Sequence, residues 1–284
     1  MIKLIAFLDG SKYSKSVCDY AAWIAAKVGG SVDLIHVLGR RDESSAPVDL
    51  SGSIGLGART ALLEELAELD GQMARLSHKR GRAILEDARD ILQGAGISQV
   101  NTLLRNDGIV EAVQDFEKEA DLIVIGKRGE GTESDEMHLG SNFERAVRAS
   151  HKPIMVASFH FRPVKRGLIA FDGGPSAMKA VNYLARNQVF NDIKCHLLSV
   201  TAPTDKAKKQ LESAAVLLRD AGYTVDTTIQ PGQPEAVICE KIKTDHFDLL
   251  LMGAYGHSHI RNLIIGSTTT AMIRSCKIPV LLFR

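Results

Sequence analysis

The feature that most constrains the fold is a duplication, because the chain of 284 residues carries the same series of segments twice. Residues 4–10, Leu-Ile-Ala-Phe-Leu-Asp-Gly, return as Leu-Ile-Ala-Phe-Asp-Gly at residues 168–173. Residues 121–129, Asp-Leu-Ile-Val-Ile-Gly-Lys-Arg-Gly, return as Asp-Leu-Leu-Leu-Met-Gly-Ala-Tyr-Gly at residues 248–256. Copies this far apart indicate a duplication at the scale of a domain rather than a short solenoid repeat. We therefore expect two domains of one fold, residues 1–160 and residues 161–284.

Each half alternates apolar runs with amphipathic segments. The runs have the composition of buried parallel strands. Between the first two runs, Val17, Ala21, Ile24 and Val28 recur at helical spacing, and Gly29 follows as a stop signal. Strands that alternate with helices predict an α/β fold with a parallel sheet in each half. In such sheets ligands bind beyond the carboxyl ends of the strands.

A glycine pattern in the second half indicates the kind of ligand. Gly253 and Gly256 follow an apolar run, and Gly266, Ser267 and Thr268 come after nine further residues. Glycines at a strand end let the backbone approach a ligand closely. A Gly-Ser-Thr helix start presents unpaired N–H groups to an anion. The pattern predicts a phosphate-bearing ligand and favours a nucleotide. The alternative is turn geometry and helix capping without a ligand.

The first half carries an altered copy of this pattern. Gly126, Gly129, Gly140 and Ser141 stand in the corresponding places, but ten residues separate the second and third glycines. That segment holds four carboxylates, which repel a polyphosphate unless a divalent cation intervenes. Lys127 and Arg128 oppose this effect. We expect a weakened or altered site in the first half.

Together, these segments resemble the universal stress protein family in its tandem two-domain form. The resemblance covers the chain except for about residues 39–80. It implies two tandem doubly wound domains, each with a five-stranded parallel sheet flanked by helices, similar to adenine-nucleotide alpha-hydrolases. It also implies ATP or another adenine nucleotide as the ligand, with or without Mg²⁺, and a role in stress survival or signalling.

The resemblance also suggests roles for two residues at strand ends in the second half. Asp172 would accept hydrogen bonds from the ribose hydroxyls, and the backbone of Val200 would meet adenine. Asp172 can equally cap the following helix, and Val200 can be an ordinary strand residue. Their counterparts in the weaker first site are Asp9 and Val37.

Charge is distributed unequally between the halves. Residues 1–160 carry 19 Lys and Arg against 24 Asp and Glu, whereas residues 161–284 carry 16 against 10. A positive second half favours a polyphosphate ligand there. No helix-turn-helix, zinc-finger or RNA-binding motif accompanies it, so we expect no nucleic-acid partner.

The sequence also indicates where the protein works. No apolar run reaches the ~18–20 residues of a membrane span. The first residues read as a strand rather than a signal peptide. The four cysteines are scattered without a C-x-x-C motif, which is typical of reduced thiols. We expect a cytoplasmic protein.

Three functions remain open. The first is a nucleotide-binding regulator, the second is a slow ATPase or another ATP-using enzyme of the same fold, and the third is a scaffold for an unknown protein partner without a nucleotide. No constellation of base and nucleophile is evident, so we expect no catalytic residues. His257 and His259 lack a third ligand nearby in sequence, so we predict no metal site. Arg261 is either a phosphate ligand or a surface residue.

Two features concern assembly. Both halves end in short apolar strands, at residues 154–157 and 279–283, which are typical of edges that pair. We expect the two domains to pair as an intrachain pseudo-dimer, and a homodimer remains open. The halves differ at residues 39–80, where a polar loop leads into a helix over about 58–93. Gly71 and Gly81 leave a kink or two helices open. This insertion is either an elaborated crossover, a lid or a partner surface.

Overall fold

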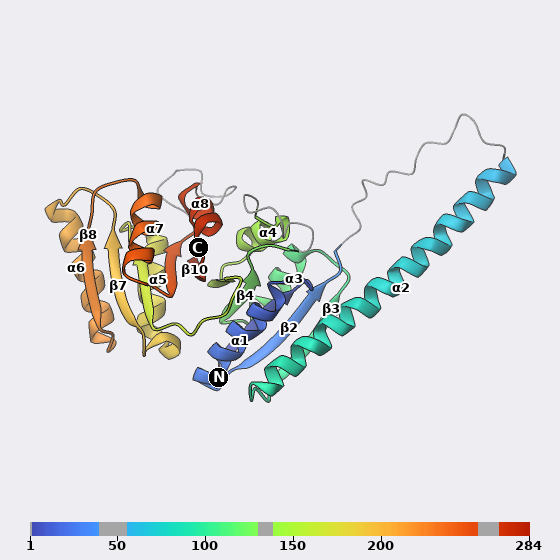
Figure 1. The fold of residues 1–284 in the computed structure, drawn as a ribbon, viewed down its shortest axis with the longest axis horizontal. Helices are drawn as coiled ribbons and strands as arrows, with labels where there is room; N and C mark the ends of the chain where they lie inside the picture. The colour runs from blue at the N-terminus through green and yellow to red at the C-terminus, as the bar shows by residue number, and fades with distance from the viewer. Residues whose placement is uncertain (1, 40–55, 130–138, 255–266) are drawn as a thin grey trace.

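The structure is a computed structural model, and it describes residues 2–39, 56–129, 139–254 and 267–284 (Figure 1). The elements of the first half are β1 (Lys3–Leu8), α1 (Ser14–Val28), β2 (Ser31–Val37), α2 (Leu56–Gly94), β3 (Val100–Arg105), α3 (Ile109–Phe116), β4 (Leu122–Gly126), α4 (Ser141–Ala149) and β5 (Ile154–Ala157). Those of the second half are β6 (Arg166–Ala170), α5 (Pro175–Arg186), the 3-10 helix η1 (Gln188–Phe190), β7 (Lys194–Ser199), α6 (Asp205–Asp220), β8 (Val225–Ile229), α7 (Pro234–Thr244), β9 (Leu249–Gly253), α8 (Ser267–Ser275) and β10 (Val280–Phe283).

All strands belong to one ten-stranded sheet in the order β3-β2-β1-β4-β5-β10-β9-β6-β7-β8. Within each half the five strands are parallel, which confirms the predicted fold class. The halves join through β5 and β10, which pair antiparallel, with Val156 opposite Val280 and Ile154 opposite Leu282. Each half thus covers the apolar edge of the other, and the predicted pseudo-dimer is confirmed.

Two apolar layers extend through both halves, one on each face of the sheet. Because side chains alternate along a strand, Leu4 and Ala6 enter one layer while Ile5 and Phe7 enter the other. The first layer includes side chains from α1, α2, α5 and α6, and the second includes side chains from α3, α4, α7 and α8. A cut between the halves would therefore open both layers as well as the β5–β10 pair.

Polar contacts reinforce the junction. In the first half, the Tyr20 hydroxyl lies 3.0 Å from Ser158 Oγ and the Ser16 hydroxyl donates to the Ser158 carbonyl at 2.7 Å, which fixes the start of the linking segment. Buried Lys127 donates to the carbonyls of Arg274, in the last turn of α8, and of Cys276, just after it, at 2.7 and 3.0 Å. A cation at the carboxyl end of a helix is favourable. The expectation of closely packed domains agrees with this arrangement.

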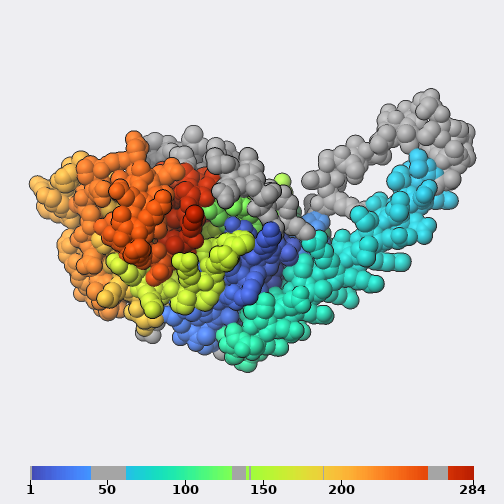
Figure 2. All heavy atoms as spheres, viewed as in Figure 1, coloured from blue at the N-terminus to red at the C-terminus, as the bar shows by residue number. Residues whose placement is uncertain are grey.

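The helix α2 is a single 39-residue helix, rather than the two helices that Gly71 and Gly81 left open. Its carboxyl-terminal part packs on β2 and β3, where Leu85, Ala88 and Leu92 are buried. Gly81 belongs to this contact, since a Cβ there would lie 2.6 Å from Leu104 Cδ1. The amino-terminal part of α2 projects away from the sheet (Figures 1 and 2).

The cysteines are all free. Cys18, Cys195 and Cys276 are buried, and burial raises the pKa of each thiol to about 12. Cys239 is only half-buried. In the described parts of the chain, none of the helices has both the length and the apolar character needed to span a bilayer.

Candidate functional site

The predicted residues of the first half line one cavity of about 310 Å³ at the carboxyl ends of β1, β2 and β4. The structure brings five of them together there: Asp9, Val37, Gly126, Gly129 and Gly140. The sixth, Ser141, directly follows Gly140 and begins α4.

Asp9 organises the turn between β1 and α1. Its Oδ1 accepts hydrogen bonds from the Ser11 backbone N–H at 3.0 Å and from the Ser14 hydroxyl at 3.3 Å. A Cβ added at Gly129 would lie 2.9 Å from Asp9 Oδ2. The carboxylate therefore caps a turn with one oxygen and faces the glycine loop with the other.

The glycines of the first half sit where side chains do not fit. A Cβ at Gly126 would lie 2.9 Å from Tyr13 Cβ, and a Cβ at Gly140 would lie 3.2 Å from the Gly129 nitrogen. Separations this short require a neighbour to move. Packing of the loop accounts for these glycines on its own, so the glycines do not by themselves identify a ligand.

The basic residues near this cavity differ in what they contact. Lys127 reaches the second half, as described above, and is not among the residues that line the cavity. Arg128 lines it, with one guanidinium nitrogen 3.5 Å from the Tyr13 hydroxyl. Ser77 and Arg80 of α2 also line it. The sequence does not predict these two, because they lie in the insertion at residues 39–80, which has no counterpart in the sequence of the second half.

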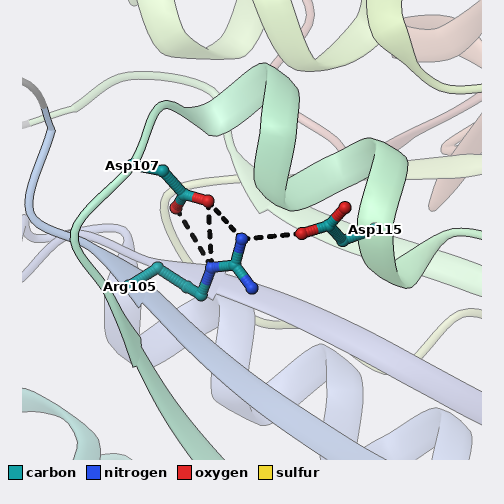
Figure 3. Close-up of polar contacts among 3 residues, drawn as sticks. All are labelled: Arg105, Asp107 and Asp115. Atoms are coloured by element: carbon teal, nitrogen blue, oxygen red, sulfur yellow. Dashed lines mark hydrogen bonds and ion pairs between the residues drawn. The ribbon is translucent and has the colours of Figure 1, made fainter.

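An ion-pair cluster holds the edge of the cavity (Figure 3). At the end of β3, Arg105 Nε donates to both oxygens of Asp107 at 3.1 Å, and another guanidinium nitrogen donates to Asp115 at 2.7 Å. These bonds raise the pKa of Arg105 above its usual value. The Arg105 carbonyl accepts from the Leu38 N–H at 2.9 Å. Arg105 thus ties Leu38 to the end of β3 through its backbone and ties α3 to it through Asp115, and Leu38 and Ile109 of α3 both line the cavity.

The second half has a cavity of about 330 Å³ at the carboxyl ends of β6 and β7. Asp172 and Val200 both line it, together with Lys206 and Gln210 of α6. Asp172 Oδ1 accepts from the Gly174 N–H at 2.8 Å, at the start of α5. Asp172 therefore makes the turn-capping contact that the sequence left open. Lys206 and Gln210 were not predicted.

The glycine pattern of the second half is only partly within the described residues. Gly253 ends β9, and a Cβ there would lie 2.8 Å from Ser176 Cβ. Its carbonyl accepts from the Thr269 hydroxyl at 3.1 Å, which ties the strand end to α8. Ser267 begins α8 and Thr268 is exposed. Five residues that the sequence analysis considered lie outside the described residues: Gly256, His257, His259, Arg261 and Gly266.

Two histidines, His36 near the end of β2 and His196 near the start of β7, are buried at places that do not correspond between the halves. His36 Nδ1 lies 2.7 Å from the Leu8 carbonyl oxygen, and His196 Nε2 lies 3.0 Å from the Thr228 hydroxyl oxygen. Across the residues that the structure describes, no three side chains of His, Cys, Asp or Glu gather as a metal site would require.

Comparison with known proteins places this architecture in a family. The family model described as the universal stress protein family matches twice, at residues 1–158 and 163–284. The chain therefore belongs to the universal stress protein family, and it carries two such units in tandem.

Full-length relatives share the tandem arrangement. The chain is 36% identical over 287 residues to the universal stress protein Slr1230 of Synechocystis, and the alignment covers 100% of both chains. A universal stress protein from Archaeoglobus fulgidus has the same fold, with a TM-score of 0.72 at 20% identity, over 99% of this chain and 96% of the other.

A family structure with a nucleotide aligns with part of the chain. It is an Arabidopsis thaliana protein solved with AMP bound, 19% identical, with a TM-score of 0.33 over 42% of this chain and 90% of its own. A likeness this limited transfers no ligand, so the ligand has to be argued from the cavities of this chain.

Proposed function

We propose that this chain is a stress-response regulatory protein of the cytoplasm that binds an adenine nucleotide, ATP, mainly in its second half. The observation that carries the proposal is the cavity of the second half, in which Asp172 and Val200 lie together at adjoining strand ends beside Lys206. The carboxyl edge of a parallel sheet is where such folds bind ligands.

Each residue has a role in this proposal. Asp172 Oδ2 accepts hydrogen bonds from the ribose while Oδ1 keeps the turn at Gly174. The backbone at Val200 meets the base. Lys206 supplies positive charge at the wall, in the half of the chain with an excess of basic residues. The phosphates lie against the start of α8 at Ser267, where helix N–H groups are free of helical partners.

Regulatory binding is favoured over turnover because the two cavity carboxylates already hold turns of the backbone. Among the described residues that line the cavities, the carboxylates are Asp9 and Asp172, and each holds a turn with its Oδ1. A general base has to be placed on the proton that it removes. We therefore propose that hydrolysis, if measured with Mg²⁺ at saturating ATP, is far slower than the ~10 s⁻¹ typical of enzymes.

Calorimetric titration of the full chain with ATP, with and without Mg²⁺, tests the proposal. Gly266→Val is expected to abolish the tight site, because a side chain there meets the phosphates. Gly140→Val, the matched change in the first half, is expected to leave it intact. Unchanged affinity in a folded Gly266→Val variant would refute the placement of the ligand in the second half. No binding to the unmodified chain would leave a scaffold as the function.

A further inference from the structure

The amino-terminal part of α2 stands apart from the rest of the molecule (Figures 1 and 2). We call residues 62–80 the arm; at its carboxyl-terminal end Ser77 and Arg80 reach the cavity of the first half, and the residues before them do not line it. Residues 63–77 are exposed on every side of the helix. A helix without tertiary contacts is only marginally stable in water, so a segment of this length is expected to be stabilised by a partner.

The arm carries a stripe of large apolar side chains. They are spaced by four, three, four and three residues, at Leu62, Leu66, Leu69, Met73 and Leu76. The last four are 47%, 51%, 58% and 60% exposed. An alternation of three and four is the spacing with which two helices pack side chains into each other's gaps. The stripe therefore fits another helix with the same spacing.

The distribution of charge along the arm indicates which helix would pack against the stripe. Its first part is acidic, and the described residues 62–70 include four carboxylates and no basic side chain: Glu64, Glu65, Glu68 and Asp70. The part that follows is basic, and residues 71–80 include three basic side chains and no carboxylate: Arg75, Lys79 and Arg80. A second copy that lies antiparallel brings acidic against basic segments at both ends, whereas a parallel copy brings like charges together.

We propose that two copies of this chain associate through their arms as an antiparallel helix pair. In the register that aligns the stripes, Leu66 packs against Leu76 of the second copy, and Leu69 packs against its Met73. Glu65 then lies beside Lys79 of the second copy on the flank of the seam. Twofold symmetry repeats each contact, so four apolar layers and two opposite-charge pairs form.

Sedimentation equilibrium of the full chain over a range of concentrations tests the association. The unmodified chain is expected to dimerise. Leu66→Gln with Leu69→Gln is expected to raise the dimer dissociation constant by ~10-fold or more. Ala67→Gln with Ala74→Gln adds the same two amides to the opposite face and is expected to change little. All four positions are exposed, so thermal unfolding of the body serves as the folding control.

Charge exchange tests the orientation. Glu65→Lys and Lys79→Glu each place like charges together in their own dimers, and each is expected to weaken dimerisation at low salt. Mixed together, the two variants are expected to form the heterodimer, since both pairs then join opposite charges. A monomer at every concentration overturns the proposal. So does a dimer insensitive to Leu66 and Leu69, or one in which the two charge variants do not prefer each other.

Discussion

The two halves cross from their second to their third strand with helices of different lengths. In the first half the crossing helix is α2, of 39 residues, and in the second it is α6, of 16 residues. Both helices cover the turn after the first strand of their half. Arg80 and Ile84 lie over Gly10, and Gln210 lies over Gly173. The duplication thus retained the position of each cavity, while the helix that covers it changed in length and in charge.

The junction between the halves sets the largest expected effect. Residues 1–160 and 161–284, expressed separately, each expose a β5 or β10 edge and both apolar layers. We expect neither piece to remain monomeric, and we expect a mixture to recover a one-to-one complex, because unpaired apolar edges associate. Light scattering after chromatography measures both outcomes. Two stable monomers that ignore each other would contradict the pseudo-dimer as the source of stability.

The second-largest expected effect is a difference between the two cavities in affinity for ATP. We expect one tight site per chain in metal-free buffer. Asp172→Ala is expected to weaken it ~10-fold or more through loss of the ribose contact. Asp9→Ala removes the same kind of turn cap in the first half and should leave the tight site unchanged. Calorimetry gives both affinity and stoichiometry. Two equal sites, or equal effects of the two substitutions, would remove the proposed asymmetry.

The arm and the packed part of α2 differ in what their glycines do. A Cβ at Gly71 meets nothing within 4 Å, whereas one at Gly81 meets Leu104 Cδ1 at 2.6 Å and His36 Cδ2 at 2.8 Å. The His36 ring is held by the Leu8 carbonyl, so it does not yield easily. Overpacking by Gly81→Ala should therefore lower the unfolding free energy by ~1–3 kcal/mol. The higher helix propensity of alanine offsets part of this loss. Gly71→Ala should leave it unchanged or raise it by up to ~1 kcal/mol.

Thermal and urea unfolding of the two variants, compared with the unmodified chain, measure this difference. A stable Gly81→Ala variant would mean that the helix can lift from β2 and β3 at little cost.

These glycines also show how far the sequence could predict the structure. The repeat and the helical spacing were sufficient for the fold, since the apolar periodicity of α1 and of the strands is local information. Gly81 read as a weak point in a helix, but its reason is contact with Leu104 and His36, which no local pattern contains. The site residues likewise include some that the sequence predicts and some that it does not. Asp172 and Val200 could be predicted to lie at one cavity from the family resemblance and because strand ends meet at one edge of the sheet. Lys206 and Gln210 could not, because they lie on a helix whose rotation over the cavity is set by packing.

The smallest expected effect concerns pH and the buried histidine of the second half. Burial lowers the pKa of His196 below its usual 6.5, and the positive charge of Lys241 acts in the same direction. Between the folded and the ordinary pKa, the unfolded chain binds more protons than the folded one. This contribution to stability is therefore fully present above pH ~6.5 and falls as the pH drops below it. His196→Gln keeps a polar partner for Thr228 and should flatten this part of the pH profile of unfolding. Denaturant titrations at several pH values between ~5 and ~7.5 measure the slope, and an identical slope in the variant would assign the pH dependence to other groups.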